Sequence, residues 1–256
     1  MQGEQNFWDH LDTLRAGVLR VAAFLLVGMI ALFVAMPTLF QEVILAPTEE
    51  DFILYRWIAR LAGSASIFGS KPLEVELINI HVASQFTTHL SASFYGALLL
   101  TVPYLLYEIW RFISPALYPR EVRGVRIAFV SGGGLFYAGC LVGYLIVFPI
   151  MFRFLAQYSL SDAIATQISL QSYMNNFWGM TLTMGLAFEL PIVVWLLSAL
   201  GLVKRAQLRA ARRYVVCALL VVAALITPSG DPFTLAVVFL PLYLLYEAGI
   251  LCAKAK

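Results

Sequence analysis

Long apolar stretches separated by polar segments dominate the chain, and this pattern predicts membrane-crossing helices. A hydrocarbon core of roughly 30 Å needs about 20 apolar residues in a helix. Six stretches are candidates, and none holds more than one residue of Asp, Glu, Lys or Arg. They cover residues 18–40, 86–107, 127–148, 174–200, 214–226 and 233–250. The pattern therefore predicts an all-α integral membrane protein, with residues 1–256 forming a single polytopic membrane domain.

The composition agrees with a membrane protein. Hydrophobic residues make up 61% of the 256 residues and charged residues 12%, which is about half the charged share of an ordinary soluble domain. The net charge is only +2, so the chain lacks the basic field of a nucleic-acid-binding module. The composition thus excludes a disordered protein, a nucleic-acid-binding module and a typical cytosolic enzyme.

The basic residues predict the face of the membrane on which each loop lies, because Lys and Arg gather in cytoplasmic loops. If the N-terminus is cytoplasmic, thirteen of the 17 Lys and Arg residues lie on the cytoplasmic side. The four on the other side are Arg56, Arg60, Lys71 and Arg153. This bias predicts six crossings with both termini in the cytoplasm.

The segment between the first two stretches is long enough to form a structure outside the membrane. Residues 49–51 are acidic, apolar residues follow at helical spacing, and Gly63 closes the segment, which predicts a short amphipathic helix. Residues 73–77 alternate as an extended segment does. We expect a small extracytoplasmic cap that includes Pro47. Asp231, in the turn between the last two stretches, is expected at the same face.

The fifth and sixth stretches are short. At 1.5 Å per residue, the apolar residues of 214–226 span only about 20 Å, roughly 10 Å less than the usual core. In one interpretation, Arg212 and Arg213 extend to the membrane surface and the helix tilts little. In the other, the mismatch thins the bilayer locally or recruits partner helices. The sequence leaves both open.

Glu189 is a carboxylate near the middle of the fourth stretch, two residues before Pro191. A charged group in hydrocarbon is costly and normally faces a bundle interior or a hydrated cavity. Pro191 also leaves the carbonyl of Ala187 without its helical hydrogen bond. Glu189 is thus either a functional polar site or a structural carboxyl satisfied by a hydroxyl or main-chain partner. We favour function, because such groups are rarely tolerated in membranes.

Two further carboxylates lie in or beside the loop after the second stretch. Glu121 follows Pro119 by two residues, and Pro at the first helical position with an acid in the first turn is typical of a helix start. The alternative is an anion that receives a cationic ligand. Glu108 lies one turn before Arg111 and can pair with it.

The first residues of the chain predict an amphipathic helix at the membrane surface, because Phe7, Leu11 and Leu14 recur at helical spacing. Asp9 and Asp12 place two acids on a cytoplasmic surface whose loops are otherwise basic. A solvated polar face is the alternative interpretation of these acids.

The sequence lacks the motifs of several enzyme classes. The phosphate loop G-x-x-x-x-G-K-[ST], H-E-x-x-H and G-x-S-x-G do not occur. His81 and His89 would lie about 12 Å apart along a helix, too far to share a metal ion. We expect no enzymatic activity, cofactor or metal. The alternatives are a proton-coupled small-solute transporter that uses Glu189 and a structural scaffold.

Five motifs together make the chain resemble the TatC family, the receptor core of the twin-arginine protein translocase. The inner-loop motif, the second of the five, is the most specific, and the resemblance covers nearly the whole chain. The motifs are His10-Leu11-x-x-Leu14-Arg15, Trp110-x-Phe112-Ile113-x-Pro115-Ala116-Leu117-Tyr118 followed by Glu121, Phe188-Glu189-x-Pro191, Thr227-Pro228 with Asp231, and Glu247.

The resemblance implies a cup-shaped six-helix bundle whose cytoplasmic face binds signal peptides with two adjacent arginines. It places the central carboxylate of this site on Glu121. The family's second acid belongs to an H-L-x-E-L-R motif, and this chain has Thr13 there. Asp12, Asp9 or Thr13 would then assist Glu121. The remaining expected site residues are Arg15, Phe112, Pro115 and Tyr118.

The resemblance also implies partners and a location. Single-helix membrane proteins of the TatA and TatB type would dock at the short fifth and sixth helices, and the assembly would be oligomeric. The apolar part of the signal peptide would lie along the concave face near Glu189. Export would use the proton gradient across the bacterial inner membrane.

Overall fold

The computed structural model describes residues 2–49, 51–62, 77–114, 119–158, 161, 167–199, 201–227 and 230–253. Within the helices, the side chains of residues 2–11, 59, 61–62 and 119–124 lie outside this description. The expected site residues Pro115 and Tyr118 lie outside the described residues.

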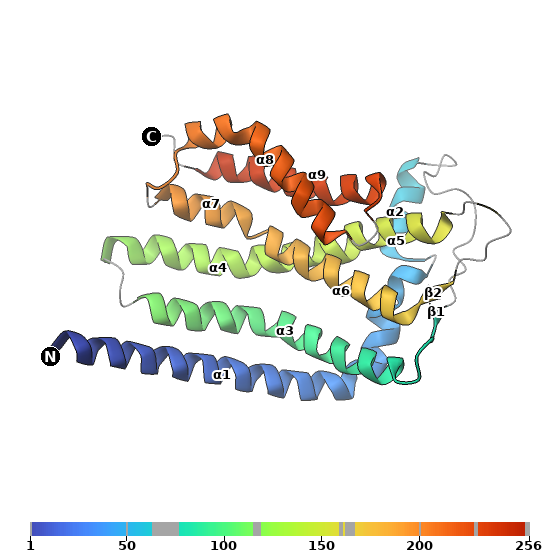
Figure 1. Cartoon of the computed structure of the whole chain (residues 1–256), viewed down its shortest axis with the longest axis horizontal. Helices are drawn as coiled ribbons and strands as arrows, with labels where there is room; N and C mark the ends of the chain where they lie inside the picture. The colour runs from blue at the N-terminus through green and yellow to red at the C-terminus, as the bar shows by residue number, and fades with distance from the viewer. Residues whose placement is uncertain are drawn as a thin grey trace. The chain divides into compact units, whose positions relative to one another are not determined.

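The chain is built almost entirely of helices (Figure 1). Two very short strands, β1 and β2, interrupt the helical order. The elements in order are α1 (Gln2–Leu39), the π-helix η1 (Phe40–Ile44), the 3-10 helix η2 (Ala46–Thr48), α2 (Ile53–Ala62), β1 (Leu77–Ile78), α3 (Ser84–Ile113), α4 (Pro119–Val142), the π-helix η4 (Gly143–Val147), α5 (Phe148–Gln157), β2 (Ile168–Ser169), α6 (Leu170–Ala187), α7 (Leu190–Ala199), α8 (Arg205–Ile226) and α9 (Pro232–Cys252).

Over their described residues the six predicted apolar stretches fall on helical elements, with one break at residues 188–189 in the fourth, and this confirms the predicted helical membrane fold. Five helical segments of the described chain are long and apolar enough to cross a membrane. The fifth stretch, 214–226, is the apolar part of α8, whose first half carries arginines. At 22 and 21 residues, α8 and α9 are the two shortest of the six.

The predicted helix ends were too conservative. α1 begins at Gln2 and joins the helix predicted at the start of the chain to the first apolar stretch without a break, whereas α8 begins at Arg205 instead of Tyr214. The reason is that Arg, Gln and Ala are good helix formers, so a helix continues past its apolar part into water or the headgroup layer. An apolar stretch marks the part of a helix that contacts hydrocarbon, and not the whole helix.

Contacts between Cα atoms divide the chain into two compact units. Unit 1 holds residues 1–37 and 89–134, and unit 2 holds residues 38–88 and 135–256. The expectation of a single polytopic domain stays a prediction.

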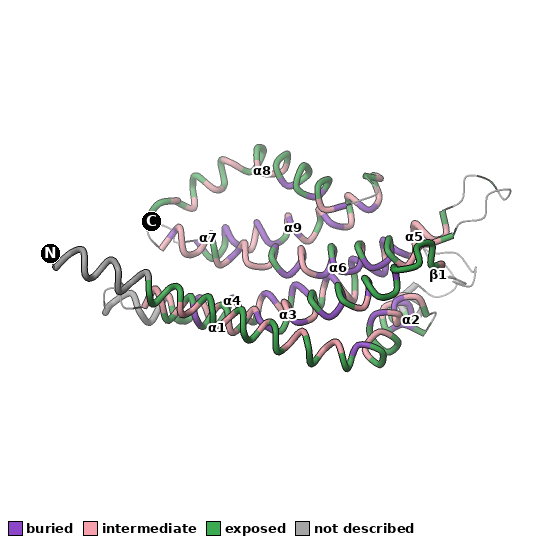
Figure 2. Tube along the Cα trace, turned by 60° about the horizontal axis from the view of Figure 1, so that its bottom comes forward, coloured by how far each residue is buried: buried purple, intermediate pink, exposed green. Residues whose placement is uncertain are grey.

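In unit 1, α1 packs antiparallel against α3 (Figure 1). At one end, His89 Nε2 hydrogen-bonds the carbonyl of Phe33 at 2.8 Å, and the two rings stack. In the middle, Gly28 lies against Ala97. Of the described α1 side chains, only Met36 is buried (Figure 2). Most of α1 therefore stays available to lipid or to another chain.

In unit 2, an aromatic core lies between α5 and α6. Phe148, Phe152, Tyr173 and Phe177 are all buried. Phe148 meets Tyr173 and Phe177 edge-on, with ring centroids 5.3 Å apart in each case. This edge-to-face arrangement is the one aromatic rings prefer.

Glycines allow α4 and α6 to approach closely in unit 2. A Cβ atom on Gly139 would lie 2.5 Å from the carbonyl oxygen of Met184, which no side chain tolerates. On the facing helix, a Cβ atom on Gly185 would lie equally close to Cys140 Sγ. A Cβ atom on Gly143, four residues after Gly139, would lie 3.0 Å from the carbonyl oxygen of Met180, so close packing of a small-residue face explains both glycines.

The segment after α1 is attached to the helices of unit 2 through tyrosine hydroxyls. Tyr55 of α2 donates to the carbonyls of Pro47 and Pro149, at 3.0 and 3.2 Å. Tyr144 donates to the carbonyl of Val43 at 2.8 Å, and Tyr173 donates to the carbonyl of Ile44. Together with β1, which pairs in parallel with β2, these residues form the predicted small cap.

Within the cap, α2 is the predicted amphipathic helix. Of the predicted extended segment 73–77, only Leu77 lies within the described residues, and it belongs to β1. Its partner strand at Ile168 was not predicted, because two residues carry too little pattern to be recognised.

Candidate functional site

Glu189 lies at a break between two helices of unit 2. α6 ends at Ala187, α7 begins at Leu190, and the main-chain nitrogens of Ile192 and Val193 both bond to the carbonyl of Glu189. Pro191 is buried in the first turn of α7. The Glu189 side chain is half-buried, and no other described residue forms an ion pair with it.

The two residues assigned to the cap and the turn have structural roles. Pro47 is fully buried and accepts the Tyr55 hydrogen bond. Asp231 is the N-cap of α9, and its Oδ1 accepts a hydrogen bond from the main-chain nitrogen of Thr234 at 2.7 Å. An aspartate in this position satisfies one of the unpaired N–H groups at a helix start.

The predicted recognition residues within the described part of the chain lie in unit 1, on α1, α3 and α4. Asp9, Asp12, Thr13 and Arg15 belong to α1, and the last three are exposed. Phe112 lies in the last turn of α3. The main chain of Glu121 lies in the first turn of α4, which begins at Pro119, as the Pro-then-acid pattern predicts.

Thr13 and Phe112 line the same groove, which has a volume of about 320 Å³. The groove runs between α1 and α3, and its surface is almost wholly apolar. Asp12 and Arg15 are not among its lining residues. The lining consists of Thr13, Leu14, Gly17, Val18, Arg20, Val21, Ala22, Leu25, Leu105, Glu108, Ile109, Arg111 and Phe112.

An ion pair that we did not predict forms part of this groove. Arg20 Nε donates to Glu108 Oε1 at 2.8 Å, and Arg20 Nη2 donates to Glu108 Oε2 at 2.9 Å. The Tyr104 hydroxyl donates to Oε1 at 2.9 Å. Glu108 therefore pairs with Arg20 on α1 and not with Arg111, its predicted partner. A bidentate guanidinium–carboxylate pair is stronger than an ion pair between exposed side chains one helical turn apart.

The same arrangement recurs in unit 2, between α8 and α9. Arg212 Nη2 donates to Glu247 Oε2 at 2.6 Å, and the Tyr243 hydroxyl donates to Glu247 Oε1 at 3.0 Å. In both clusters a glutamate binds an arginine of another helix and the tyrosine one turn earlier on its own helix. The cluster of Glu247 is the more exposed of the two.

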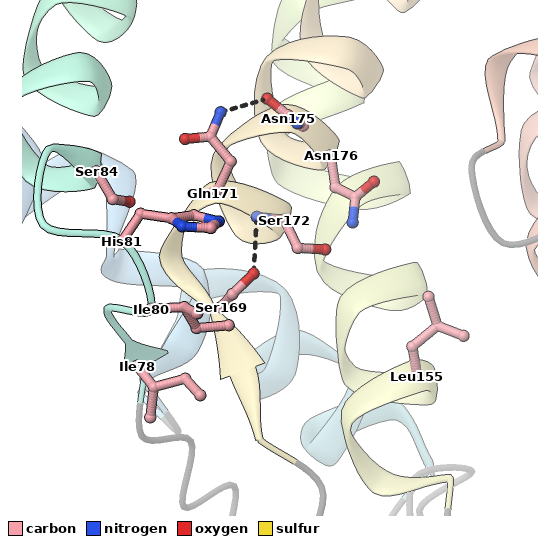
Figure 3. Close-up of a pocket in the computed structure, with 10 residues that line it drawn as sticks. All are labelled: Ile78, Ile80, His81, Ser84, Leu155, Ser169, Gln171, Ser172, Asn175 and Asn176. Atoms are coloured by element: carbon pink, nitrogen blue, oxygen red, sulfur yellow. Dashed lines mark hydrogen bonds between the residues drawn. The ribbon is translucent and has the colours of Figure 1, made fainter.

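A second cavity, of about 540 Å³, lies in unit 2 beside β1 and β2 (Figure 3). Its polar lining is made of amides, hydroxyls and His81, and the described lining residues include no Asp, Glu, Lys or Arg. Gln171 Nε2 donates to Asn175 Oδ1 at 3.3 Å across one helical turn. Among the recognition residues whose side chains the structure describes, none lines this cavity.

The described helices define a multi-pass α-helical membrane protein, and comparisons with known proteins identify its family. The family described as Sec-independent protein translocase protein (TatC) matches residues 9–241. A TatC protein of Deinococcus radiodurans is 34% identical over 248 residues, covering 96% of this chain and 85% of that protein. A TatC protein of Escherichia coli K12 is 34% identical over 191 residues, 75% of this chain and 73% of that protein.

Solved structures agree with the sequence comparison. A crystal structure of the twin-arginine translocase receptor TatC has a TM-score of 0.70 and 29% identity, covering 95% of this chain and 97% of that one. A second, in the detergent DDM, has a TM-score of 0.75 and 28% identity, covering 96% and 99%. The chain belongs to the TatC family, and is thus a multi-pass component of the twin-arginine protein translocase of the bacterial inner membrane.

Proposed function

We propose that this chain is the receptor of the translocase and binds twin-arginine signal peptides of folded proteins at its cytoplasmic face. The positive-inside bias of the sequence supports a cytoplasmic position for both termini. The same orientation brings the start of α1, the end of α3 and the start of α4 to the cytoplasmic side. These are the segments that carry Asp9, Asp12, Thr13, Phe112 and Glu121.

The chemistry of recognition requires carboxylates. A guanidinium offers a planar fork that a carboxylate accepts with both oxygens, and lysine cannot reproduce this geometry. Glu121 in the first turn of α4 is the proposed acceptor for one arginine of the signal peptide. The family resemblance adds Arg15, Pro115 and Tyr118 to the proposed site.

The observation that carries the proposal is the apolar groove shared by Thr13 and Phe112. Signal peptides continue into an apolar segment after their arginines, and the groove offers apolar walls directly beside two positions of the recognition motifs. A transporter of small solutes has no need for such a surface at the ends of two helices.

The same proposal assigns a docking role to α8. Its side chains Tyr214, Val221 and Leu225 are exposed to 65, 60 and 82%, although they lie in the apolar part of the helix. We propose that single-helix partners of the TatA and TatB type cover this face, and that the short apolar length of α8 thins the bilayer where folded cargo passes, driven by the proton gradient.

Photocrosslinking at residue 121 tests the receptor proposal. A photoreactive residue at this position should label a signal peptide with Arg-Arg in native membranes, and should not label the same peptide with Lys-Lys. Glu121→Ala should abolish export while the protein stays in the membrane. The matched control is Glu42→Ala, which removes an exposed carboxylate just beyond the C-terminal end of α1. Labelling that ignores the arginines would refute the assignment.

A further inference from the structure

We propose that Glu108 supplies the second carboxylate for the twin-arginine signal peptide, and that Arg20 occupies this carboxylate until the peptide displaces it. The inference rests on the proposed receptor function. It starts from the groove between α1 and α3, because Thr13 holds the position of the family's acid and Glu108 lines the same groove.

The position of Glu108 suits this role. Its side chain is only 7% exposed, so the carboxylate is largely shielded from water, where charge-assisted hydrogen bonds are strongest. Gly17 lies one helical turn after Thr13 on α1, and a Cβ atom there would be 3.5 Å from Glu108 Oε2. The face of α1 that carries Thr13 therefore continues directly to the Glu108 carboxylate.

The Glu108 carboxylate can exchange one guanidinium partner for another. An ionised carboxylate offers about four lone-pair sites. Arg20 uses two of them and Tyr104 one. The Arg20 side chain is itself 40% exposed, so it can turn toward water once its place is taken. Exchange of one arginine for another conserves the hydrogen bonds of the carboxylate, while a lysine would restore only part of them.

This mechanism predicts opposite effects for the two partners of one ion pair. Glu108→Gln removes the acceptor, so the affinity for an Arg-Arg peptide should fall about ten- to hundredfold, the worth of one charged hydrogen bond. Arg20→Gln removes the competitor and keeps an amide donor for Glu108, so the affinity should rise. A pair that only holds α1 against α3 would shift both affinities in the same direction, or neither.

The experiment measures the dissociation constant of a synthetic signal peptide, with Arg-Arg or Lys-Lys, for the full-length protein in lipid nanodiscs. Glu247→Gln is the matched control, because it breaks an equivalent glutamate–arginine–tyrosine cluster in unit 2. It should lower stability and leave peptide affinity unchanged. Thr13→Glu in the Glu108→Gln background restores an acid to the groove and should recover binding of the Arg-Arg peptide.

The outcomes separate the inference from the proposed function. Opposite shifts, with rescue by Thr13→Glu, support the role of Glu108. The inference is overturned if both variants shift the peptide affinity in the same direction. It is also overturned if Glu108→Gln has no effect while Glu121→Ala abolishes binding. Either result leaves the receptor proposal intact. If the unmodified chain binds both peptides equally, the receptor proposal fails as well. If Arg20→Gln does not accumulate, the Thr13→Glu rescue decides alone.

Discussion

Arg212 of α8 and Glu247 of α9 form an ion pair of 2.6 Å that joins the two shortest crossing helices. The arginine is 47% exposed and the glutamate 27%, so water screens their attraction. Either Arg212→Gln or Glu247→Gln should lower the free energy of unfolding by about 1 kcal/mol or less. Thermal melting in detergent measures this loss, and the double variant should lose no more than the worse single variant.

Helix packing at Gly139 provides a second prediction. Gly139→Ala places a methyl group 2.5 Å from the Met184 carbonyl oxygen, so α4 and α6 must separate, at a cost of about 1–3 kcal/mol. Gly134→Ala on the same helix is the control, because its added methyl meets nothing within 4 Å. The melting temperatures of the two variants are compared, and equal values would contradict the packing argument.

The cap provides a third prediction. Tyr55→Phe removes a buried hydroxyl and leaves the carbonyls of Pro47 and Pro149 without this donor. The loss should be about 1–2 kcal/mol, and α2 should exchange its amide hydrogens faster. Tyr158→Phe, at an exposed site, is the matched control. Hydrogen exchange followed by mass spectrometry measures the difference, and unchanged protection of residues 53–62 would refute the anchoring role.

Glu189 provides a fourth prediction, which separates its two interpretations. Glu189→Gln preserves volume and hydrogen-bonding capacity but removes the charge. If the charge serves export, the export rate should fall about tenfold, the equivalent of one charged hydrogen bond, while the amount of protein in the membrane stays the same. A structural carboxyl would instead give normal export, or less protein in the membrane. Quantitative export assays with immunoblots of the membranes report both quantities.

The sequence was informative where a pattern extends over many residues. Apolar runs located all six helices, and the Pro119–Glu121 pattern located the start of α4. It was less informative at helix ends, where polar helix formers continue the helix without any apolar signal. It missed β2, whose two residues have no recognisable pattern.

The Arg20–Glu108 pair could not be predicted from the sequence, because it depends on the axial position of α1 relative to α3. A weak signal did exist. Arg20 lies near the start of the first apolar stretch and Glu108 just after the end of the second, so the alternation of crossings places both at one face of the membrane. Arg111, one turn from Glu108, obscured this signal by offering a nearer partner.

The attachment of the cap has a consequence for how its sequence can vary. Tyr55, Tyr144 and Tyr173 all donate to main-chain carbonyls, those of Pro47, Val43 and Ile44. Every residue has a main-chain carbonyl, so these hydrogen bonds depend on the backbone path of residues 43–47 and not on their side chains. The three tyrosines are therefore constrained, while the exposed side chain of Val43 in η1 can change during evolution without shifting the cap.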